Sequence, residues 1–408
     1  MRPALLALIL ALALAGCRGG AGEETRTDTV TETVADTVTE SVADTDAESV
    51  ADTDAETVAD TDAELSTEPG AFVVGAVDDA ARDPGPVLGQ LAAAGFRAVG
   101  ITSYWEPGLS APTAEELGVL QDVADRAGKR DLRIFLAVFH RGSSTTPLTA
   151  AERTAFSSYV AAIMRDVPKI RDVIVGNEPN LNRFWLPQFG EDGENLAAVF
   201  YLALLAEVYD AAKMAAPDAR IWGGALAPRG IDKPNTGRDT HSPTTFIRDL
   251  GAELRRTGRT RPVLDGFAFH PYPAASSISP DRPHPGSRTL GLADHERLRR
   301  LLREAFGRDV PILYSEFGVE TTIPAEKAEL YQGSEAGTPV DEATQADFYR
   351  RALELAACQE DVVGMLLFHS HDEPFLTGFQ SGVYYVDGTP KTSLAPVREA
   401  IVGVRNGC

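Results

Sequence analysis

The stretch DVIVGNEPN, residues 172–180, joins a short apolar run to a polar tail that contains a glutamate. The stretch PILYSEFG, residues 311–318, has the same plan. Apolar runs without polar alternation predict strands that are buried on both faces, as in a parallel sheet. Each of these two predicted strands leads directly into a glutamate, Glu178 in the first case and Glu316 in the second.

Runs of the same kind recur along most of the chain. Eight of them have strand length: Phe72–Val77, Ala98–Ser103, Arg133–Phe139, Asp172–Gly176, Arg220–Leu226, Gly266–His270, Pro311–Ser315 and Val362–Phe368. Amphipathic segments predict helices at Pro86–Ala94, Ala114–Ala127, Ala150–Arg165, Asn195–Ala216, Pro243–Arg256, Asp294–Phe306, Asp341–Ala357 and Ser393–Val402. Eight alternations of strand and helix predict one α/β domain over residues 71–408, a (β/α)8 TIM barrel.

The first residues have the pattern of an export signal. Arg2 is basic, residues 4–15 are apolar, and small residues precede Cys17. This pattern predicts a signal peptide over residues 1–16 and, because it ends like a lipoprotein cleavage box, acylation of Cys17. The alternative is an ordinary secretory signal in which Cys17 has no role. Acylation would anchor the protein by lipid to the cell membrane, facing the extracytoplasmic side.

Residues 17–70 have a different composition, rich in Thr, Asp, Glu, Ala and Val. Three octads with the pattern Ser/Thr-Val-Ala-Asp-Thr-Asp-Ala-Glu follow one another from Ser41 to Glu64. Residues 18–70 carry 16 acidic and 2 basic side chains, so most of the formal net charge of −22 lies there. A segment of this kind cannot bury a core and repels itself, which predicts a disordered, extended tether. The remaining acidic balance of residues 71–408 gives no reason to expect nucleic-acid binding.

Two more cysteines, Cys358 and Cys408, remain in a chain expected to be exported. In an oxidising compartment they can form one disulfide, which would hold the C-terminus against the outer ring of helices. The alternative is two free thiols. No Cys/His cluster has the spacing of a zinc site, and no glycine-rich phosphate loop is present, so we expect no metal and no cofactor.

Polar residues follow several of the predicted strands, at the end where barrel enzymes carry their chemistry. They are His140, Asn177, Glu178, His270, Tyr272, Glu316 and His369. Two carboxylates held on one rigid scaffold are what glycosidic bond cleavage needs, because one protonates the leaving oxygen while the other attacks the anomeric carbon or activates water. The alternative for either glutamate is a salt bridge at the rim of the barrel.

The Asn177-Glu178-Pro179 motif and the later Glu316 resemble the clan A glycoside hydrolases, which include families 5 and 39. The resemblance extends over most of residues 71–400. It implies a retaining mechanism in which Glu178 is the general acid/base and Glu316 is the nucleophile. It also implies that Asn177 binds the 2-hydroxyl of the sugar, and that Tyr272 supports the nucleophile. His140 and His270 match positions where the family often has histidines in the pocket.

Aromatic side chains near strand ends are candidates for stacking on sugar rings. Trp105 and Trp185 are the two that we expect to face substrate, whereas Trp222, inside a predicted strand, is expected in the core. Much of the clan has a tryptophan after the eighth strand, where this chain has Phe368 and His369, so either of these would replace it. The nearby residues 369–373, HSHDE, could also be metal ligands, but we expect a polar rim loop.

Together these patterns predict a retaining glycoside hydrolase that cleaves O-glycosidic, and specifically β, bonds of an oligo- or polysaccharide outside the cell membrane. The loops predicted at residues 231–242 and 274–290 would shape its cleft. A tethered protein is expected to be a monomer. The alternative from a different class is a carbohydrate-binding or envelope lipoprotein that keeps the barrel without turnover.

Overall fold

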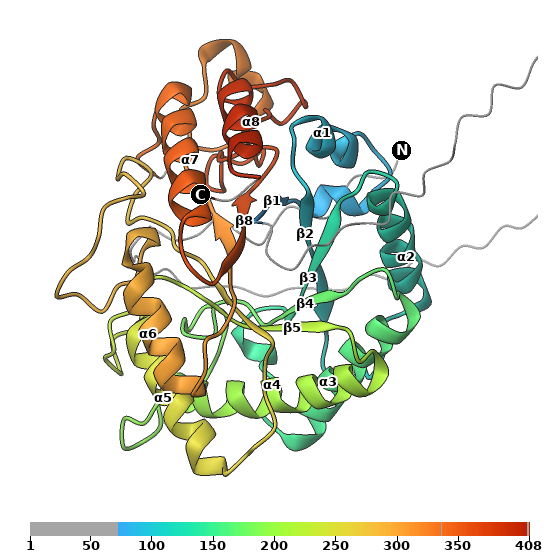
Figure 1. Ribbon diagram of the computed structural model, residues 1–408, viewed down its shortest axis with the longest axis vertical. Helices are drawn as coiled ribbons and strands as arrows, with labels where there is room; N and C mark the ends of the chain where they lie inside the picture. Colours follow the sequence, from blue (N-terminus) through green and yellow to red (C-terminus); the bar gives the residue numbers. More distant parts are fainter. Residues whose placement is uncertain (1–71, 336, 406–407) are drawn as a thin grey trace, which may run out of the picture. The chain divides into compact units, whose positions relative to one another are not determined.

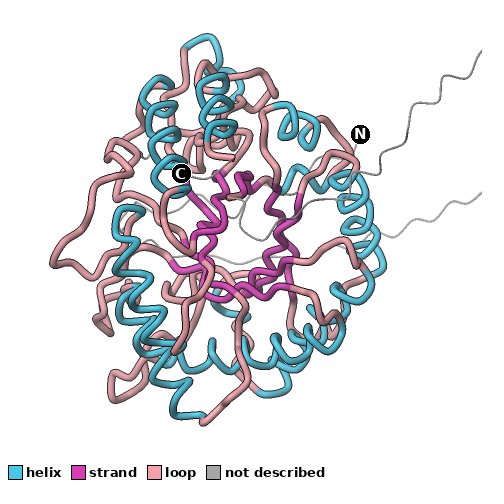
Figure 2. Tube along the Cα trace, in the orientation of Figure 1, coloured by secondary structure: helices cyan, strands magenta, loops and turns pink. Residues whose placement is uncertain are grey.

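The computed structural model describes residues 72–335, 337–405 and 408. Eight parallel strands form a closed barrel in which each strand pairs with the next in sequence and β8 pairs with β1. The strands form a central ring, and the helices surround it (Figures 1 and 2). The prediction of a (β/α)8 TIM barrel is confirmed. The signal peptide, Cys17 and the tether lie entirely outside the described residues.

All eight predicted strands are present, with ends that differ by up to two residues. They are β1 Val73–Val77, β2 Ala98–Trp105, β3 Arg133–His140, β4 Asp172–Val175, β5 Arg220–Leu226, β6 Gly266–Phe269, β7 Ile312–Phe317 and β8 Val362–Phe368. The largest differences are at β2 and β7, which continue beyond the predicted ends. Glu316 therefore lies within β7 rather than after it.

All eight predicted helices are present as well. They are α1 Val87–Ala93, α2 Ala114–Gly128, α3 Ala150–Asp166, α4 Leu196–Ala215, α5 Pro243–Thr257, α6 His295–Phe306, α7 Glu342–Ala357 and α8 Leu394–Gly403. Several begin at side-chain caps, of which Thr149 with Glu152 forms a capping box at the start of α3. Short 3₁₀ helices occur in the connections at Asp79–Arg82, Ser143–Thr145, Leu292–Asp294 and Ala325–Leu330.

The core has two parts that correspond to the two faces of the strands. The larger cluster lies between the strands and the surrounding helices and includes residues of all eight helices. The smaller cluster consists only of strand residues, among them Phe135, Ile174, Trp222 and Leu366, and fills the inside of the barrel. Burial of both strand faces explains the uninterrupted apolar runs of the sequence. Trp222 is in the core, as predicted.

The N-terminal end of the barrel is closed by a buried ion network around Asp172, the first residue of β4. This carboxylate is fully buried and accepts two hydrogen bonds from Arg133 and two from Arg220, at 2.6 to 2.8 Å. The indole N–H of Trp222 donates a fifth, at 2.9 Å. Burial alone would raise the pKa of Asp172, but the two arginines outweigh it, so its pKa is lowered and the carboxylate stays charged.

Cys358, directly after α7, is joined to Cys408 by a disulfide across a sequence separation of 50. The bridge that the sequence allowed is thus present in the structure. A loop of this length corresponds to about 4 kcal/mol of stabilisation in the chain-entropy description. None of the helices in the described part of the chain is both long and apolar enough to cross a membrane.

Two strands have irregular pairing near their C-terminal ends. The register between β5 and β6 shifts between Gly224 and Leu226, and the register between β7 and β8 shifts between Tyr314 and Phe317. In β5, Gly224 has φ 98° and a Cβ there would lie 2.6 Å from the Ala268 carbonyl oxygen, so only glycine fits. Bulges of this kind re-aim side chains beside binding sites. Both irregularities lie next to the two glutamates of interest.

Candidate active site

Glu178 is held at the end of β4 by contacts to the neighbouring β5. Its φ of 39° lies in the left-handed region, which is uncommon for a residue with a side chain. The backbone N–H of Glu178 donates to the Ala225 carbonyl at 2.8 Å. Asn180, fully buried, donates to the Ala227 carbonyl at 3.2 Å and accepts from the Ala227 N–H at 3.0 Å. The strained conformation is therefore maintained by bonds to the next strand, as is common at active sites.

Glu316 lies at the irregularity of β7, between Tyr314 and Phe317. Three steps along β7 correspond to two along β8 at this point, because Tyr314 pairs with Met365 and Phe317 with Leu367. The extra residue turns the Glu316 side chain into the C-terminal mouth of the barrel, where it is 20% exposed. The hydroxyl of Tyr272 donates a hydrogen bond to Glu316 Oε2 at 3.0 Å. Tyr272 and Glu316 are thus in direct contact, and the supporting role that the resemblance implied for Tyr272 stays a prediction.

The two glutamates converge on one histidine. Nδ1 of His270, which follows β6, lies 3.1 Å from Glu178 Oε1 and 3.6 Å from Glu316 Oε2. The two carboxylate oxygens are therefore at most about 6.7 Å apart, the sum of these two distances. The barrel brings together two acids that are 138 positions apart in sequence.

Burial and mutual charge set the protonation of this group. Burial opposes the charged form of His270, but Glu316 and Glu178 outweigh it and raise its pKa. Burial also raises the pKa of Glu316, and the Glu178 charge adds to this rise, while His270 and the Tyr272 hydroxyl oppose it. The imidazole between two carboxylates therefore favours its cationic form, which reduces the repulsion between them.

The remaining predicted polar residues lie around this centre. Asn177, between Gly176 and Glu178, is half-buried. His140 is buried at the end of β3, with Nδ1 2.8 Å from the Gly142 carbonyl, and burial lowers its pKa to about 4, so it is neutral at physiological pH. Its ring lies edge-on to Trp185, with centroids 5.5 Å apart. His140 is therefore a buried, neutral side chain packed beside Trp185 at the end of β3.

An aromatic cluster stands beside Glu316. Phe368, at the end of β8, lies 6.3 Å from Tyr272 and 5.1 Å from Phe379, measured between ring centroids. Phe379 comes from the loop after β8, is half-buried, and also lies 6.4 Å from Tyr272. His369 packs on Phe368 and its Nδ1 lies 3.2 Å from the Val77 carbonyl. Phe379 carries no signal in the sequence, because it lies eleven residues beyond β8, whereas Phe368 and His369 lie at the end of that strand.

The prediction that Trp105 and Trp185 face substrate is wrong for this structure. Trp105 is completely buried, packs on Phe156 and donates from its indole N–H to the Leu109 carbonyl at 2.7 Å. Trp185 is 1% exposed and lies edge-on to Tyr201. The reason for Trp105 is that β2 extends to include it and turns it outward toward the helices. Neither ring offers a face to a sugar.

The HSHDE segment, residues 369–373, is dispersed among different partners. His371 contacts Asp78 at 3.1 Å and Gln90 at 3.0 Å, at the junction of β8 and β1. Asp372 forms an ion pair with Lys391 at 2.8 Å, and both side chains are fully buried. No group of three or more His, Cys, Asp or Glu side chains among the described residues is arranged to hold a metal ion. The side chains of this segment therefore have separate structural partners.

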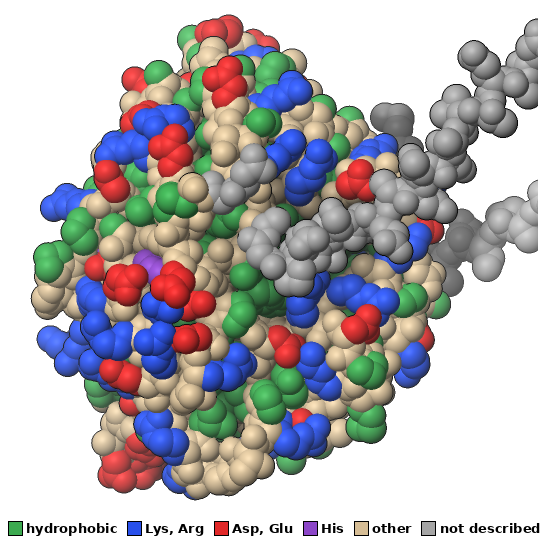
Figure 3. Space-filling view, viewed as in Figure 1, with side chains coloured by type: hydrophobic (Ala, Val, Ile, Leu, Met, Phe, Trp, Pro, Cys, Tyr) green, Lys and Arg blue, Asp and Glu red, His purple; other side chains and the backbone are tan. Residues whose placement is uncertain are grey.

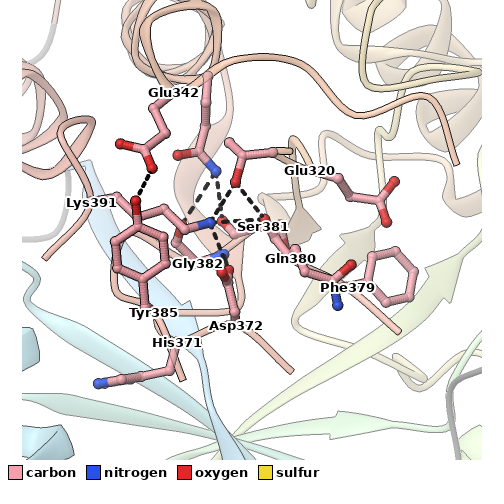
Figure 4. A network of polar contacts seen from close by, with 12 residues as sticks. Glu320, Glu342, His371, Asp372, Phe379, Gln380, Ser381, Gly382, Tyr385 and Lys391 are labelled. Atoms are coloured by element: carbon pink, nitrogen blue, oxygen red, sulfur yellow. Dashed lines mark hydrogen bonds and ion pairs between the residues drawn. The ribbon is translucent and has the colours of Figure 1, made fainter. Parts of the chain in front are cut away.

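Lys391 is the centre of a polar network that joins the loops after β7 and β8 (Figure 4). Its ammonium group donates to Asp372, to the Gln380 carbonyl at 3.0 Å and to Thr321 at 2.6 Å. Ser381, the next residue but one after Phe379, hydrogen-bonds the Phe368 carbonyl. The network therefore fixes the segment that presents Phe379 beside Glu316. A lone lysine between polar residues gave no sequence signal of this role.

Charged side chains of both signs are interspersed over the face seen in Figure 3, rather than gathered by sign. The charges that act on a bound substrate are therefore those close to Glu316 and Glu178, rather than the net charge of the chain. Arg141 lies over the Tyr104 ring, with 4.0 Å from its guanidinium carbon to the ring centroid, and Arg229 donates from Nη1 to the Tyr272 carbonyl at 3.2 Å. Neither arginine belongs to a motif that the sequence alone would reveal.

The Tyr272→Phe variant is expected to shift the acidic limb of the pH–rate profile to higher pH. The pKa of Glu316 is already raised above its ordinary value of 4.5, and the Tyr272 hydroxyl is one of the groups that lower it. If Glu316 must be ionised to react, losing this donor raises the pH at which activity appears and reduces kcat/KM about 10- to 100-fold. Tyr209→Phe, which removes a hydroxyl bonded to Asp265 on the outside of the barrel, is the matched control. A limb that stays in place or moves to lower pH would contradict the assignment.

Comparisons with known proteins agree with this architecture. No protein-family model and no curated protein matches the sequence. Among solved structures, a family 39 glycoside hydrolase from the gut symbiont Bacteroides cellulosilyticus WH2 has 16% identity and a TM-score of 0.58, with 81% of this chain and 63% of that chain covered. The β-glycosidase BGL167 has 16% identity and a TM-score of 0.55, with 83% and 97% covered. GH5_18 from Streptomyces cattleya, in complex with GlcNAc, has 17% identity and a TM-score of 0.54, with 82% and 80% covered.

This chain spans just under two thirds of the length of the family 39 enzyme. At identities of 16 to 17%, the likeness concerns the fold, and one fold can carry many activities. Any function must therefore be argued from the residues at the mouth of the barrel. The chain shares its barrel fold with glycoside hydrolases of several families.

Proposed function

We propose that this protein is a retaining glycoside hydrolase that cleaves β-glycosidic bonds of an oligo- or polysaccharide. The observation that supports this most is the convergence of Glu178 and Glu316 on His270, which limits their nearest oxygens to at most about 6.7 Å. Retaining enzymes hold the two carboxyl groups about 5 to 5.5 Å apart, and inverting enzymes about 6.5 to 9.5 Å. The upper limit for this pair of oxygens includes the retaining distance, and this supports the proposal of a retaining mechanism.

In the first step, Glu178 donates its proton to the glycosidic oxygen while a carboxylate oxygen of Glu316 attacks the anomeric carbon. The bond to the leaving group breaks, and a covalent ester forms between the sugar and Glu316. In the second step, Glu178 takes a proton from water, whose oxygen attacks the same carbon and releases Glu316 as a carboxylate. Each acid is thus restored after one turnover.

His270 and Tyr272 assist by stabilising the negative charge on the two glutamates. The Tyr272 hydroxyl stabilises the ionised form of Glu316 before attack. Nδ1 of His270 lies within reach of both carboxylates, so its cationic form compensates the negative charge that passes between them during the reaction. We assign the aromatic cluster of Tyr272, Phe368 and Phe379 to the wall against which the sugar binds, because aromatic faces suit the apolar C–H faces of sugar rings.

The alternative is a carbohydrate-binding lipoprotein without turnover. The hydrogen bond from Tyr272 to Glu316 and the strained backbone at Glu178 favour the enzyme, because a binding wall needs neither. The residues that carry the site are the same in both cases, and the two proposals differ only in whether a bond is broken.

The stereochemistry of the first product tests the proposal. A panel of aryl β-glycosides is incubated with the protein, and proton NMR of the earliest product is recorded before mutarotation. We expect release of the aryl group from at least one sugar and a β configuration in the product. An α product would rule out the nucleophile role of Glu316, and no release across the panel would favour the binding alternative.

We also propose that Cys17 is acylated and that the acidic tether holds the enzyme, as a monomer, outside the cell membrane. The lipoprotein cleavage box and the repeated acidic octads of the sequence support this. Cys17→Ser should move the protein from the membrane fraction to the soluble extracytoplasmic fraction. Retention of this variant in the membrane fraction would contradict lipid anchoring at Cys17.

A further inference from the structure

Arg229 is carried by a rigid segment that follows β5. The Ala225 carbonyl accepts from the Glu178 N–H, and Ala227 exchanges two hydrogen bonds with the buried Asn180. The Pro228 carbonyl accepts from the Leu290 N–H at 3.1 Å. On the other side of Arg229, a Cβ at Gly230 would lie 2.1 Å from the His241 carbonyl oxygen, so the backbone is closely packed there. The position of the arginine is therefore fixed by the same bonds that fix Glu178.

The guanidinium of Arg229 has donors to spare. One nitrogen, Nη1, donates to the Tyr272 carbonyl at 3.2 Å. Within residues 72–335 and 337–405, no carboxylate lies within ion-pair distance of Arg229, although Arg133, Arg153, Arg220, Arg259 and Arg299 all have such partners. A guanidinium presents five N–H donors in a fork that matches a carboxylate or sulfate. Arg229 is exposed at the rim, so a ligand can reach the remaining donors.

Arg229 lies on the side of the site where the leaving group departs. The backbone bonds from Ala225 to Glu178 and from Ala227 to Asn180 place the Arg229 segment beside the acid/base rather than beside the strand of the nucleophile. Desolvation lowers the pKa of Arg229, and the Glu178 charge opposes this shift, in agreement with that placement. The acid/base must face the glycosidic oxygen, and thus the sugar beyond it. An anion bound by Arg229 would belong to that sugar.

We propose that Arg229 recognises a negatively charged substituent, a carboxylate or a sulfate, on the leaving-group side of the substrate. The inference rests on the proposed glycosidase function and narrows its substrate class to acidic glycans. The inference is based on one feature: Arg229 is a fixed cation beside the acid/base, and part of its N–H donors are unused. The bond to the Tyr272 carbonyl orients the guanidinium without consuming the rest of the fork.

The test uses a pair of aryl β-glycosides of whichever sugar the wild-type protein hydrolyses, one with a 4-carboxyphenyl and one with a 4-carbamoylphenyl leaving group. The two aglycones have similar shape and differ in charge. We expect the ratio of kcat/KM for the carboxyphenyl over the carbamoylphenyl substrate to fall about tenfold in Arg229→Gln, with partial recovery in Arg229→Lys. Comparing the ratio between variants cancels the intrinsic reactivity of each leaving group.

Arg238→Gln, in the exposed loop after the same strand, removes an equal charge and should leave the ratio unchanged. If Arg229→Gln lowers kcat/KM equally for the two substrates, Arg229 only positions Tyr272 and the inference is wrong. An equal fall of the ratio in Arg238→Gln would mean a general charge effect and would also overturn it. Absence of hydrolysis of every aryl glycoside by the wild type would instead defeat the proposed function, and this inference with it.

Discussion

Glu316→Gln should lower kcat on the order of 10⁴-fold or more with every aryl β-glycoside, whatever the leaving group. Gln keeps the shape of the side chain, and its amide can still meet the Tyr272 hydroxyl, so the fold should be preserved. What is lost is the carboxylate oxygen that forms the covalent bond to the sugar in the proposed mechanism. Steady-state rates with activated and unactivated leaving groups check this, and circular dichroism checks the fold.

Glu178→Gln should show a different dependence on the leaving group. With a poor leaving group, the loss of the proton donor should reduce kcat by about 10² to 10⁴-fold. With 2,4-dinitrophenolate, which leaves without protonation, the first step should remain fast and the second should be slow, because water has no base. A burst of dinitrophenolate should appear, and mass spectrometry should find one sugar on the peptide that contains Glu316.

The matched control for both changes is Glu106→Gln. Glu106 is a rim carboxylate that follows β2, with a 63% exposed side chain whose nearest cation, Arg141, is 3.9 Å away. Its loss should leave kcat within about twofold, as expected for a weakly coupled surface charge. A Glu178→Gln, Glu316→Gln double variant that kept wild-type turnover would show that the chemistry takes place elsewhere.

Lys391→Met should reduce the free energy of unfolding by about 3 to 5 kcal/mol, because it leaves the Asp372 carboxylate buried without its cation. Both side chains of this pair are completely buried, and burial favours the neutral form of each, raising the pKa of Asp372 and lowering that of Lys391. The attraction between the two groups opposes both pKa shifts. Urea denaturation followed by fluorescence measures the change.

Two further variants make the test specific. Lys327→Met removes a cation from a partly exposed ion pair with Asp387, whose N–O distance is also 2.8 Å. This change should reduce the free energy of unfolding by less than about 1 kcal/mol. Asp372→Leu combined with Lys391→Met should be more stable than Lys391→Met alone, because no charge is left unpaired. Equal losses in Lys391→Met and Lys327→Met would show that the buried pair has no special role.

The fold could be predicted almost completely from the sequence, because burial of both strand faces leaves an uninterrupted apolar signal. Glu178, Glu316 and Tyr272 could be located because each stands near a strand end. Phe379 and Lys391 could not, because their positions depend on how a long loop packs. Arg229 is as close to a strand end as Tyr272, but it stands between Pro228 and Gly230 with no motif that singles it out. Trp105 was misplaced for a related reason: apolar patterning does not reveal where a strand stops, and two additional residues turned the ring from the rim into the core.

The two register irregularities were equally invisible to pattern analysis. A single extra residue beside Glu316 and another beside Ala225 leave the apolar character of β7 and β5 unchanged. Their effect is on direction alone, since they rotate side chains near the mouth of the barrel. The glycine pair at Gly223 and Gly224 was the one sign of the irregularity in β5. The reason for these glycines is visible only in the structure, where the neighbouring strand leaves no room for a side chain at Gly224.

The bridge between Cys358 and Cys408 has a practical implication for anyone producing this protein. The segment it encloses contains β8, Phe379 and Lys391, so one wall of the pocket sits inside a covalent ring. Material made in a thiol-rich cytosol would lack that ring, whereas material secreted to the periplasm would acquire it. The route of expression thus decides how firmly this wall is secured when activity is first assayed.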